Sequence, residues 1–457
     1  MNIHPPKIEI PPDDPYRNDI FKDRKEFGES ITSLLKSVDD SVVLSVNAPW
    51  GEGKTTFARM WMADLKRQKI AHIYFDAYQH DHCEDPFIAF TAEIIDLVDR
   101  HFKGIEGIKK LKKEFLSSAA RVGGKLFETF ARLGAKVLTN NILDAAAIEE
   151  LSTIKDDLSD KAGSLLERAV NAGLKKYVKE KDDEAHFREQ LSDLGRAIKK
   201  HQSLPLLIII DELDRCRPDF AMNLIERVKH LFTTEGVAFV LLCNSNQLEN
   251  YVRTVYGTGI DARNYLRKFF TIATDLPKEI VDDNKNAFDV FSRSLYSHYG
   301  IGNLQQKSYP TVLFQRYNFS LREIEQYLQL LGISMSQEPR YEMSFDCVLV
   351  LLAVIKMRSR RLFDNLAIGS VTYHDLLKEA QLVGTEKIEN WYFDWAFLHE
   401  MLKFCLLPKD EFEKLPDDSS AKAISLNHPG HWLVDHRNQI IPRFCKKLNR
   451  FSFEMPK

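Results

Sequence analysis

Residues 41–68 combine a short β-branched run, a turn of small residues and a helical pattern, and this combination constrains the fold more than any other segment. The run SVVLSVNA leads into the turn PWGEG, and KTTFARMWMADLKRQ follows with apolar residues at helical spacing. Residues 48–55 match the pattern G-x-x-x-x-G-K-[ST] at every fixed position but the first, where Ala48 replaces glycine. Strand, turn and helix in this order predict a loop that binds phosphate groups.

In such a loop, backbone N–H groups turn toward the phosphates, and the helix that follows presents its positive end to them. We expect Lys54 to neutralise the β- and γ-phosphates of a nucleoside triphosphate, with ATP favoured over GTP, and the Thr55 hydroxyl to ligate Mg²⁺. Alanine tolerates a positive φ less well than glycine, so Ala48 is a mild departure. The expected phosphate-binding residues are Ala48, Pro49, Trp50, Gly51, Glu52, Gly53, Lys54, Thr55 and Thr56.

Two further apolar runs end in polar residues. LLIIIDELD places Asp211 and Glu212 after five apolar residues, and VAFVLLCNS places Asn244 after another such run. Ligands of parallel sheets bind at the carboxyl ends of the strands. We therefore expect Asp211 to bind Mg²⁺ through water, Glu212 to orient or deprotonate an attacking water, and Asn244 to sense the γ-phosphate. The alternative for Asp211 and Glu212 is a turn or the start of a helix, and the alternative for Asn244 is a turn after the strand.

Short apolar strands that alternate with helical patterns predict an α/β fold with a parallel sheet covered on both faces. Segment 71–78 is a further strand candidate, segment 87–102 a helix, and loops are expected near 301–311, 336–344 and 407–430. At 457 residues the chain is long enough for several domains. We divide it into a lead-in (1–40), the first half of an NTPase core (41–102), a helical insertion (103–202), the second half of the core (203–277), a helical lid (278–335) and a helical C-terminal domain (336–457).

The composition excludes several classes of protein. A net charge of −3 differs from the strongly basic balance of a dedicated nucleic-acid binder. No apolar run approaches the roughly 18–20 residues that span a bilayer, and the N-terminus lacks the apolar core of a secretory signal. The six cysteines include no C-x-x-C pair, which indicates buried reduced thiols rather than a zinc or redox site. We expect a cytoplasmic protein without a transmembrane segment.

Six motifs in order resemble the KAP family of P-loop NTPases, which is related to STAND and AAA+ proteins. The resemblance runs from about Pro15 to Leu330. Family members with transmembrane segments carry them between the two nucleotide motifs, and segment 103–202 resembles instead the soluble bacterial type. The motifs are PYRNDIFKDRKEFGESI, APWGEGKTT, IYFDAYQHDHCEDPF, LLIIIDELDRC, YLRKFFTIATDLP and FSLREIEQYL.

The resemblance implies a Mg²⁺-dependent ATPase that acts as a nucleotide-driven switch or assembly subunit. It also implies a homo-oligomer or an effector protein as partner, in antiviral (phage) defence. Arg322 matches the lid arginine of the family, and Arg263 and Arg267 are candidates for an arginine finger that reaches a neighbouring subunit. From the residues alone, Arg322 lies at a helix start, and the other two fit a solvated charged face equally well.

Two other functions remain open: a nucleotide-stabilised scaffold with little turnover, and a nucleic-acid-dependent motor or sensor. Segment 101–136 is locally basic, but its apolar residues fall at helical spacing and favour packing onto another helix. The C-terminal run 440–457 mixes basic and aromatic residues, which fits base stacking less well than a docked helix. His80, His82, Cys83 and Glu84 are adjacent on a loop and make a poor metal site.

Overall fold

The computed structural model describes residues 4–6, 8–82, 86–138, 165–278, 281–282, 285–301, 309–335, 345–388, 394–427 and 436–450. The chain forms two compact units, and we describe each by itself. The sheet unit comprises residues 10–49 and 53–278, and the helical unit comprises residues 1–9, 50–52 and 279–457. None of the described helices is both long enough and apolar enough to cross a membrane.

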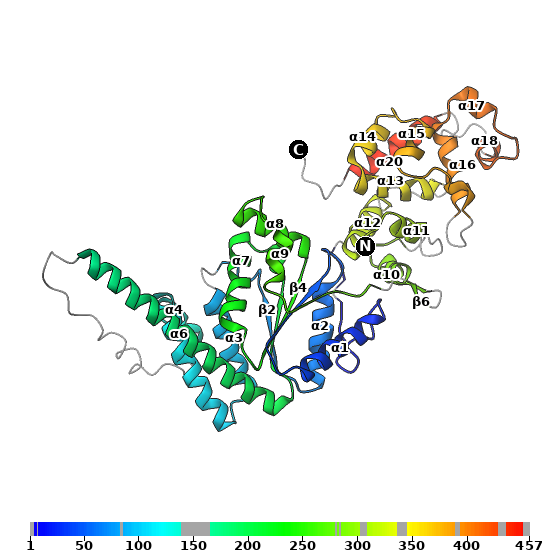
Figure 1. Cartoon of the computed structure of the whole chain (residues 1–457). Helices are drawn as coiled ribbons and strands as arrows, with labels where there is room; N and C mark the ends of the chain where they lie inside the picture. The colour runs from blue at the N-terminus through cyan, green and yellow to red at the C-terminus, as the bar shows by residue number, and fades with distance from the viewer. Residues whose placement is uncertain are drawn as a thin grey trace. The chain divides into compact units, whose positions relative to one another are not determined.

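A five-stranded sheet in the order β2-β3-β4-β1-β5 forms the centre of the sheet unit (Figure 1). All four strand pairings are parallel. The α/β fold with a parallel sheet, predicted from the sequence, is therefore confirmed. The strands are β1 (Val42–Asn47), β2 (His72–Asp76), β3 (Leu206–Asp211), β4 (Val237–Cys243) and β5 (Ile272–Asp275).

The inner strands form because β-branched and other apolar residues fill both of their faces. Every residue of β3 and of β4 is buried. Residues of these two strands that are in register, such as Ile208 and Phe239, point to the same face and pack in the same core. Since no water reaches either face of β3, its polar side chain, Asp211, lies at the end of the strand.

Helices cover both faces of the sheet (Figure 1). On one face, α1 and α2 contribute Leu35, Phe57 and Trp61 to a core with alternate residues of β1, β3 and β4. On the other face, α3, α6, α7, α8 and α9 pack against the remaining strand residues. The helices are α1 (Asp23–Ser37), α2 (Lys54–Arg67), α3 (Pro86–His101), α7 (Pro218–Arg227), α8 (Ser245–Tyr256) and α9 (Ala262–Arg267), with short turns at Leu213–Arg215 (η1) and Val228–Phe232 (η2).

Segment 103–202 contributes two long helices, α4 (Glu106–Leu138) and α6 (Leu165–Gln202), that pack along each other (Figure 1). Their described side chains nearest the sheet are part of its core. Phe115 of α4 and Phe187 of α6 are fully buried, with ring centroids 5.3 Å apart. The inner ends of these helices therefore fold with the sheet and do not form a separate body.

The helical unit is built around α13 (Asp346–Arg358), in which all residues from Asp346 to Lys356 are buried. A two-stranded antiparallel pair precedes the helices, formed by β6 (Val281–Asp282) and β7 (Lys285–Asn286). The other helices are α10 (Ala287–Tyr296), α11 (Tyr309–Arg316), α12 (Leu321–Met335), α14 (Arg360–Ala367), α15 (Tyr373–Glu379), α16 (Trp395–Leu406), α17 (Lys409–Glu413), α18 (Ser420–Asn427) and α20 (Ile440–Asn449), with short turns η5 (Thr385–Lys387) and η6 (Arg437–Gln439).

Two of the three expected loops are partly helical. The loop expected near 301–311 overlaps the start of α11, and the loop expected near 407–430 contains α17 and α18. Helices α17 and α18 have five and eight residues. Helices this short show too few turns for an apolar period, which is why the sequence did not indicate them. The loop expected at 336–344 lies outside the described residues.

Two glycines allow α6 to approach the turn before β4. Gly195 of α6 is buried, and a Cβ added there would lie 2.7 Å from the carbonyl oxygen of Gly236. The same carbonyl oxygen accepts a hydrogen bond from the N–H of Leu206, at the start of β3, at 2.8 Å. Neither backbone segment can therefore move aside without disturbing the sheet.

Replacement of Gly195 by alanine should destabilise the sheet unit. Overpacking against a backbone costs about 1–3 kcal/mol, which exceeds the roughly 0.5–1 kcal/mol that alanine gains over glycine in a helix. Chemical denaturation followed by circular dichroism would measure this change in the free energy of unfolding.

Gly107 of α4 is the matched control, because it is also helical and a Cβ added there meets no atom within 4 Å. Gly107→Ala should be neutral or slightly stabilising. Equal free energies of unfolding for the two variants would contradict the close approach at Gly195.

Candidate nucleotide-binding site

The loop between β1 and α2 has the backbone geometry of a phosphate-binding turn. Gly51 and Gly53 adopt positive φ angles of 82° and 83°, which favour glycine. Ala48 is not among the residues with positive φ, and its N–H continues the sheet by donating to the Cys243 carbonyl at 3.0 Å. Alanine at position 48 therefore introduces no backbone strain. The tip of this loop, Trp50–Glu52, belongs to the helical unit.

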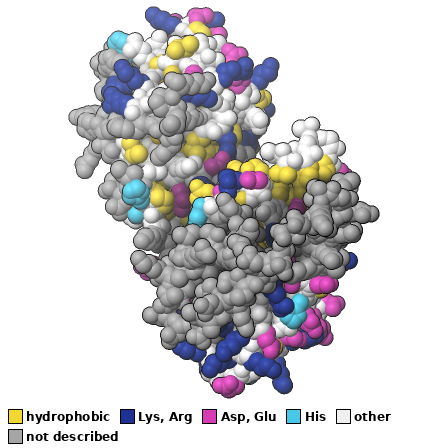
Figure 2. Space-filling model, turned by 90° about the vertical axis from the view of Figure 1, so that its left-hand side faces the viewer, with side chains coloured by type: hydrophobic (Ala, Val, Ile, Leu, Met, Phe, Trp, Pro, Cys, Tyr) yellow, Lys and Arg dark blue, Asp and Glu magenta, His cyan; other side chains and the backbone are white. Residues whose placement is uncertain are grey.

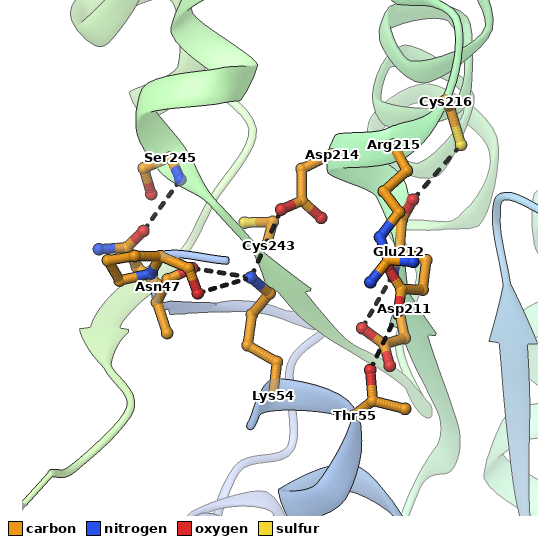
Figure 3. A network of polar contacts seen from close by, with 12 residues as sticks. Asn47, Lys54, Thr55, Asp211, Glu212, Asp214, Arg215, Cys216, Cys243 and Ser245 are labelled. Carbon is orange, nitrogen blue, oxygen red and sulfur yellow. Dashed lines mark hydrogen bonds and ion pairs between the residues drawn. The ribbon is translucent and has the colours of Figure 1, made fainter. Parts of the chain in front are cut away.

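Lys54 is the first residue of α2, and its side chain is buried beneath the loop (Figure 3). Its ammonium group donates to the carbonyl oxygens of Ala48 at 2.8 Å and Pro49 at 3.3 Å. It also lies 3.4 Å from a carboxylate oxygen of the fully buried Asp214. A positive charge is thus fixed directly under the turn that the sequence predicts to surround the phosphates.

Thr55, Asp211 and Glu212 come together at the carboxyl end of β3 (Figure 3). The Thr55 hydroxyl donates to a Glu212 carboxylate oxygen at 3.2 Å, although the two residues are 157 positions apart. Burial raises the pKa of the Asp211 carboxyl above its ordinary value, and hydrogen bonds from Thr55, the Glu212 N–H and Tyr74 oppose this rise. Burial and the neighbouring Asp211 likewise raise the pKa of Glu212.

The side-chain oxygens of Thr55 and Asp211 are suitable ligands for a magnesium ion. Mg²⁺ prefers hard oxygen ligands, and proteins usually supply one or two carboxylates while substrate phosphates and water complete the shell. The Thr55 hydroxyl and the Asp211 carboxylate provide such oxygens side by side. A divalent cation would also offset the cost of two neighbouring buried carboxylates. Thr55 and Asp211 therefore fit the ion that the sequence predicts.

Glu212 has an unusual backbone and a charged neighbour. Its φ of 59° and ψ of 20° place it in the left-handed region, which costs a non-glycine residue about 1 kcal/mol or more. Its carboxylate pairs with the Arg215 guanidinium at 2.5 Å, within the short turn η1 (Figure 3). Strain of this kind often accompanies functional sites, and here it fixes the direction in which Glu212 leaves the strand.

Asn47, at the end of β1, is a site residue that the sequence did not reveal. Its amide oxygen accepts the N–H of Ser245 at 2.9 Å (Figure 3), and its amide nitrogen donates to Asp275 at 2.7 Å. It thereby connects β1, α8 and β5. Asn244 lies half-buried at the start of α8 and makes no capping hydrogen bond. Its predicted contact with the γ-phosphate remains a prediction.

Arg24 of α1 was also missed, because its segment was interpreted only as a lead-in. Its guanidinium is buried over the Phe21 ring, 4.2 Å from the centroid, and donates to the Pro277 carbonyl at 3.4 Å. A Cβ added to Gly53 would lie 2.9 Å from Arg24 Nη1. Position 53 therefore needs glycine for its φ, and a Cβ there would also displace the Arg24 guanidinium, the end of a flexible side chain.

The three candidate arginines lie on exposed surface. Arg263 and Arg267 of α9 make no hydrogen bond or ion pair with any residue that the structure describes, so within this chain they take no part in the site. Arg322 is the second residue of α12 in the helical unit, and its backbone N–H donates to the Gly51 carbonyl in the same unit at 3.3 Å. Their predicted roles toward the nucleotide remain predictions.

The remaining candidates from the sequence are a metal site at 80–84 and two basic segments, and the described residues do not support them as sites. Among the described residues, no group of three or more His, Cys, Asp or Glu side chains could bind a metal ion. Cys83 and Glu84 lie outside those residues, and His80 stacks on Phe75 at 4.5 Å between ring centroids. The side chains of 123–138 and the end of the C-terminal run, 451–457, also lie outside them.

Comparisons with known proteins identify the family. An uncharacterized protein of Methanocaldococcus jannaschii is 24% identical over 181 residues, which cover 38% of this chain and 91% of that protein. The structure of the Aeropyrum pernix ORC2 protein, in ADPNP–ADP complexes, covers 97% of this chain and 96% of that chain at 13% identity, with a TM-score of 0.25. A TM-score this low carries no argument, and the fold assignment depends on the strand order.

The family model of the KAP family P-loop domain matches residues 24–336. This range contains the phosphate loop, the carboxylates at the end of β3 and the whole sheet. Because the match spans more than half of the chain, the protein belongs to the KAP family of P-loop proteins.

Proposed function

We propose that the protein is a Mg²⁺-dependent NTPase that uses ATP as a switch. The observation that carries this proposal is the meeting of Lys54, Thr55, Asp211 and Glu212 at one edge of the sheet. Lys54 and Thr55 start the helix after the loop, whereas Asp211 and Glu212 end a strand more than 150 residues later. One phosphate chain can reach all four side chains only at this edge.

Each side chain has a distinct role in this proposal. The Lys54 ammonium exchanges the Ala48 and Pro49 carbonyls for β- and γ-phosphate oxygens, and the loop N–H groups add neutral donors. Thr55 and Asp211 bind Mg²⁺, which when bound neutralises charge on the phosphates. Glu212 orients the attacking water and accepts its proton. Glu212 must first exchange its hydrogen bond from Thr55 for one from this water.

Hydrolysis would act as a switch because the γ-phosphate orders the groups that contact it. We place the protein in the cytoplasm, in phage defence, with an effector protein or further copies of itself as partners. The exposed Arg263 and Arg267 support assembly, since they are available to a neighbouring subunit.

Nucleic acid is a weaker candidate for a partner. Three described basic residues of α3 and α4, Arg100, Lys110 and Lys112, pair with acidic ones, as Lys112 does with Asp99 at 2.5 Å. On the face of the molecule in Figure 2, dark blue and magenta side chains lie near one another among the coloured atoms.

Phosphate release with ATP and Mg²⁺ tests the proposal. Glu212→Gln keeps the shape of the side chain but removes the base, so turnover should fall about 100-fold or more while ATP binding remains. Lys54→Ala should abolish both binding and turnover, because the charge beneath the loop is lost.

The same assay, repeated with DNA, separates the alternatives. Stimulation by DNA that weakens steeply with salt would favour a nucleic-acid-dependent motor. If Glu212→Gln has the same turnover as the wild type, Glu212 is not the catalytic base. Failure of the wild type to bind ATP would remove the proposal itself.

A second function, a nucleotide-held scaffold with little turnover, is favoured by one specific contact. The Arg215 guanidinium lies 2.5 Å from Oε2 of the Glu212 carboxylate, and the Thr55 hydroxyl donates to the other oxygen, Oε1. A carboxylate paired in this way is less available to a water molecule. Turnover would then stay slow until the ion pair opens, and the bound nucleotide would mainly stabilise the fold.

Arg215→Ala should therefore raise kcat and leave the KM for ATP unchanged. A partly exposed ion pair is worth up to about 1 kcal/mol, so an increase of about two- to fivefold is expected. Steady-state kinetics at saturating Mg²⁺ would measure it.

Arg217→Ala provides the control, because Arg217 pairs with Asp81 at 3.1 Å and is similarly exposed, but does not contact Glu212. It should leave kcat unchanged. A lower kcat in Arg215→Ala would mean that Arg215 positions Glu212 for catalysis, and the scaffold would lose its structural support.

A further inference from the structure

Tyr74 lies in β2, the edge strand beside β3, and its hydroxyl reaches the Asp211 carboxylate. Tyr74 is in register with Ile209, and Asp211 lies two residues further along β3, so all three side chains point to the same face of the sheet. The Tyr74 hydroxyl donates to Asp211 Oδ2 at 3.0 Å. This face is the one covered by α2, which carries Thr55.

Each Asp211 oxygen has a donor within the protein. The backbone N–H of Glu212 donates to Oδ1 at 2.8 Å, and Tyr74 donates to Oδ2. Rotation of the carboxylate would break both hydrogen bonds in a site without solvent exposure, where unsatisfied charge is costly. The carboxylate is therefore fixed in one orientation.

The Tyr74 ring does not require a hydroxyl for packing. It is partly buried against the core between the sheet and α2, which a phenylalanine ring would contact equally well. A phenol proton donated to an ionised carboxylate makes a charge-assisted hydrogen bond. The hydroxyl itself therefore acts on Asp211.

We propose that Tyr74 is a positioning residue for the divalent cation of this site, which orients the Asp211 carboxylate so that it and Thr55 bind the ion together. Partners of metal ligands of this kind typically contribute about 10- to 100-fold to metal affinity. In this proposal Tyr74 acts on the ion through Asp211, to whose carboxylate its hydroxyl donates. This inference rests on the proposed function.

The test compares nucleotide binding with and without the cation, for the wild type and Tyr74→Phe. Fluorescent mant-ADP is titrated in EDTA and in Mg²⁺, and Mn²⁺ binding to the ADP complex is measured by electron paramagnetic resonance. Tyr74→Phe should weaken Mn²⁺ binding about tenfold. The increase in mant-ADP affinity that Mg²⁺ produces over EDTA should fall accordingly. The affinity in EDTA should stay within about twofold, because Tyr74 contacts only the carboxylate.

Tyr327→Phe is the matched control, since it removes another buried hydroxyl, which donates to the Val350 carbonyl at 2.9 Å in the helical unit. It should leave both affinities unchanged, and thermal unfolding in EDTA would confirm that both variants fold. Equal Mn²⁺ affinity in Tyr74→Phe and wild type would overturn the inference while leaving the NTPase proposal intact. A wild type that binds no mant-ADP would overturn both.

Discussion

The parallel direction of all five strands is the constraint on which the rest of the sheet unit depends. Parallel strands bring their carboxyl ends to one edge, and β3, whose residues are all buried, has a polar side chain only at its last position. Asn47, Asp211 and Asp275 are the last residues of their strands. The fold itself therefore gathers the polar groups that a phosphate and a cation need, before any loop contributes to specificity.

A buried charge must be paired, and the pairs at this edge show what nucleotide binding has to replace. Lys54 contacts two loop carbonyls and Asp214, while Glu212 contacts Thr55 and Arg215. These contacts offset the cost of desolvating the charges. Phosphate and Mg²⁺ can bind only by exchanging some of them, so occupation of the site must move side chains. For the proposed function, this exchange would be the physical basis of the switch.

Local pattern explains what the sequence could predict. The phosphate loop, the strand before Asp211 and the helix from Lys54 all follow from neighbouring residues, and so does the α/β fold. Asn47, Tyr74 and Arg24 were missed because their partners are 137 to 253 residues away. Only strand register and helix packing decide which of many tyrosines or arginines meets such a partner. Pairing across the sheet thus supplied the part of the site that spacing could not.

The departure from the motif at Ala48 shows that the sheet and the turn place different demands on the residues of one loop. The first glycine of the pattern is dispensable here, because Ala48 is hydrogen-bonded to β4 and does not have a positive φ. The later glycine is not, because Gly53 has a φ of 83°, a conformation that other residues rarely adopt. A Cβ there would also displace the Arg24 guanidinium, but this group is the end of a flexible side chain, so the backbone angle is what requires glycine. The same motif thus contains one position where the sheet removes the need for glycine and one where the turn imposes it.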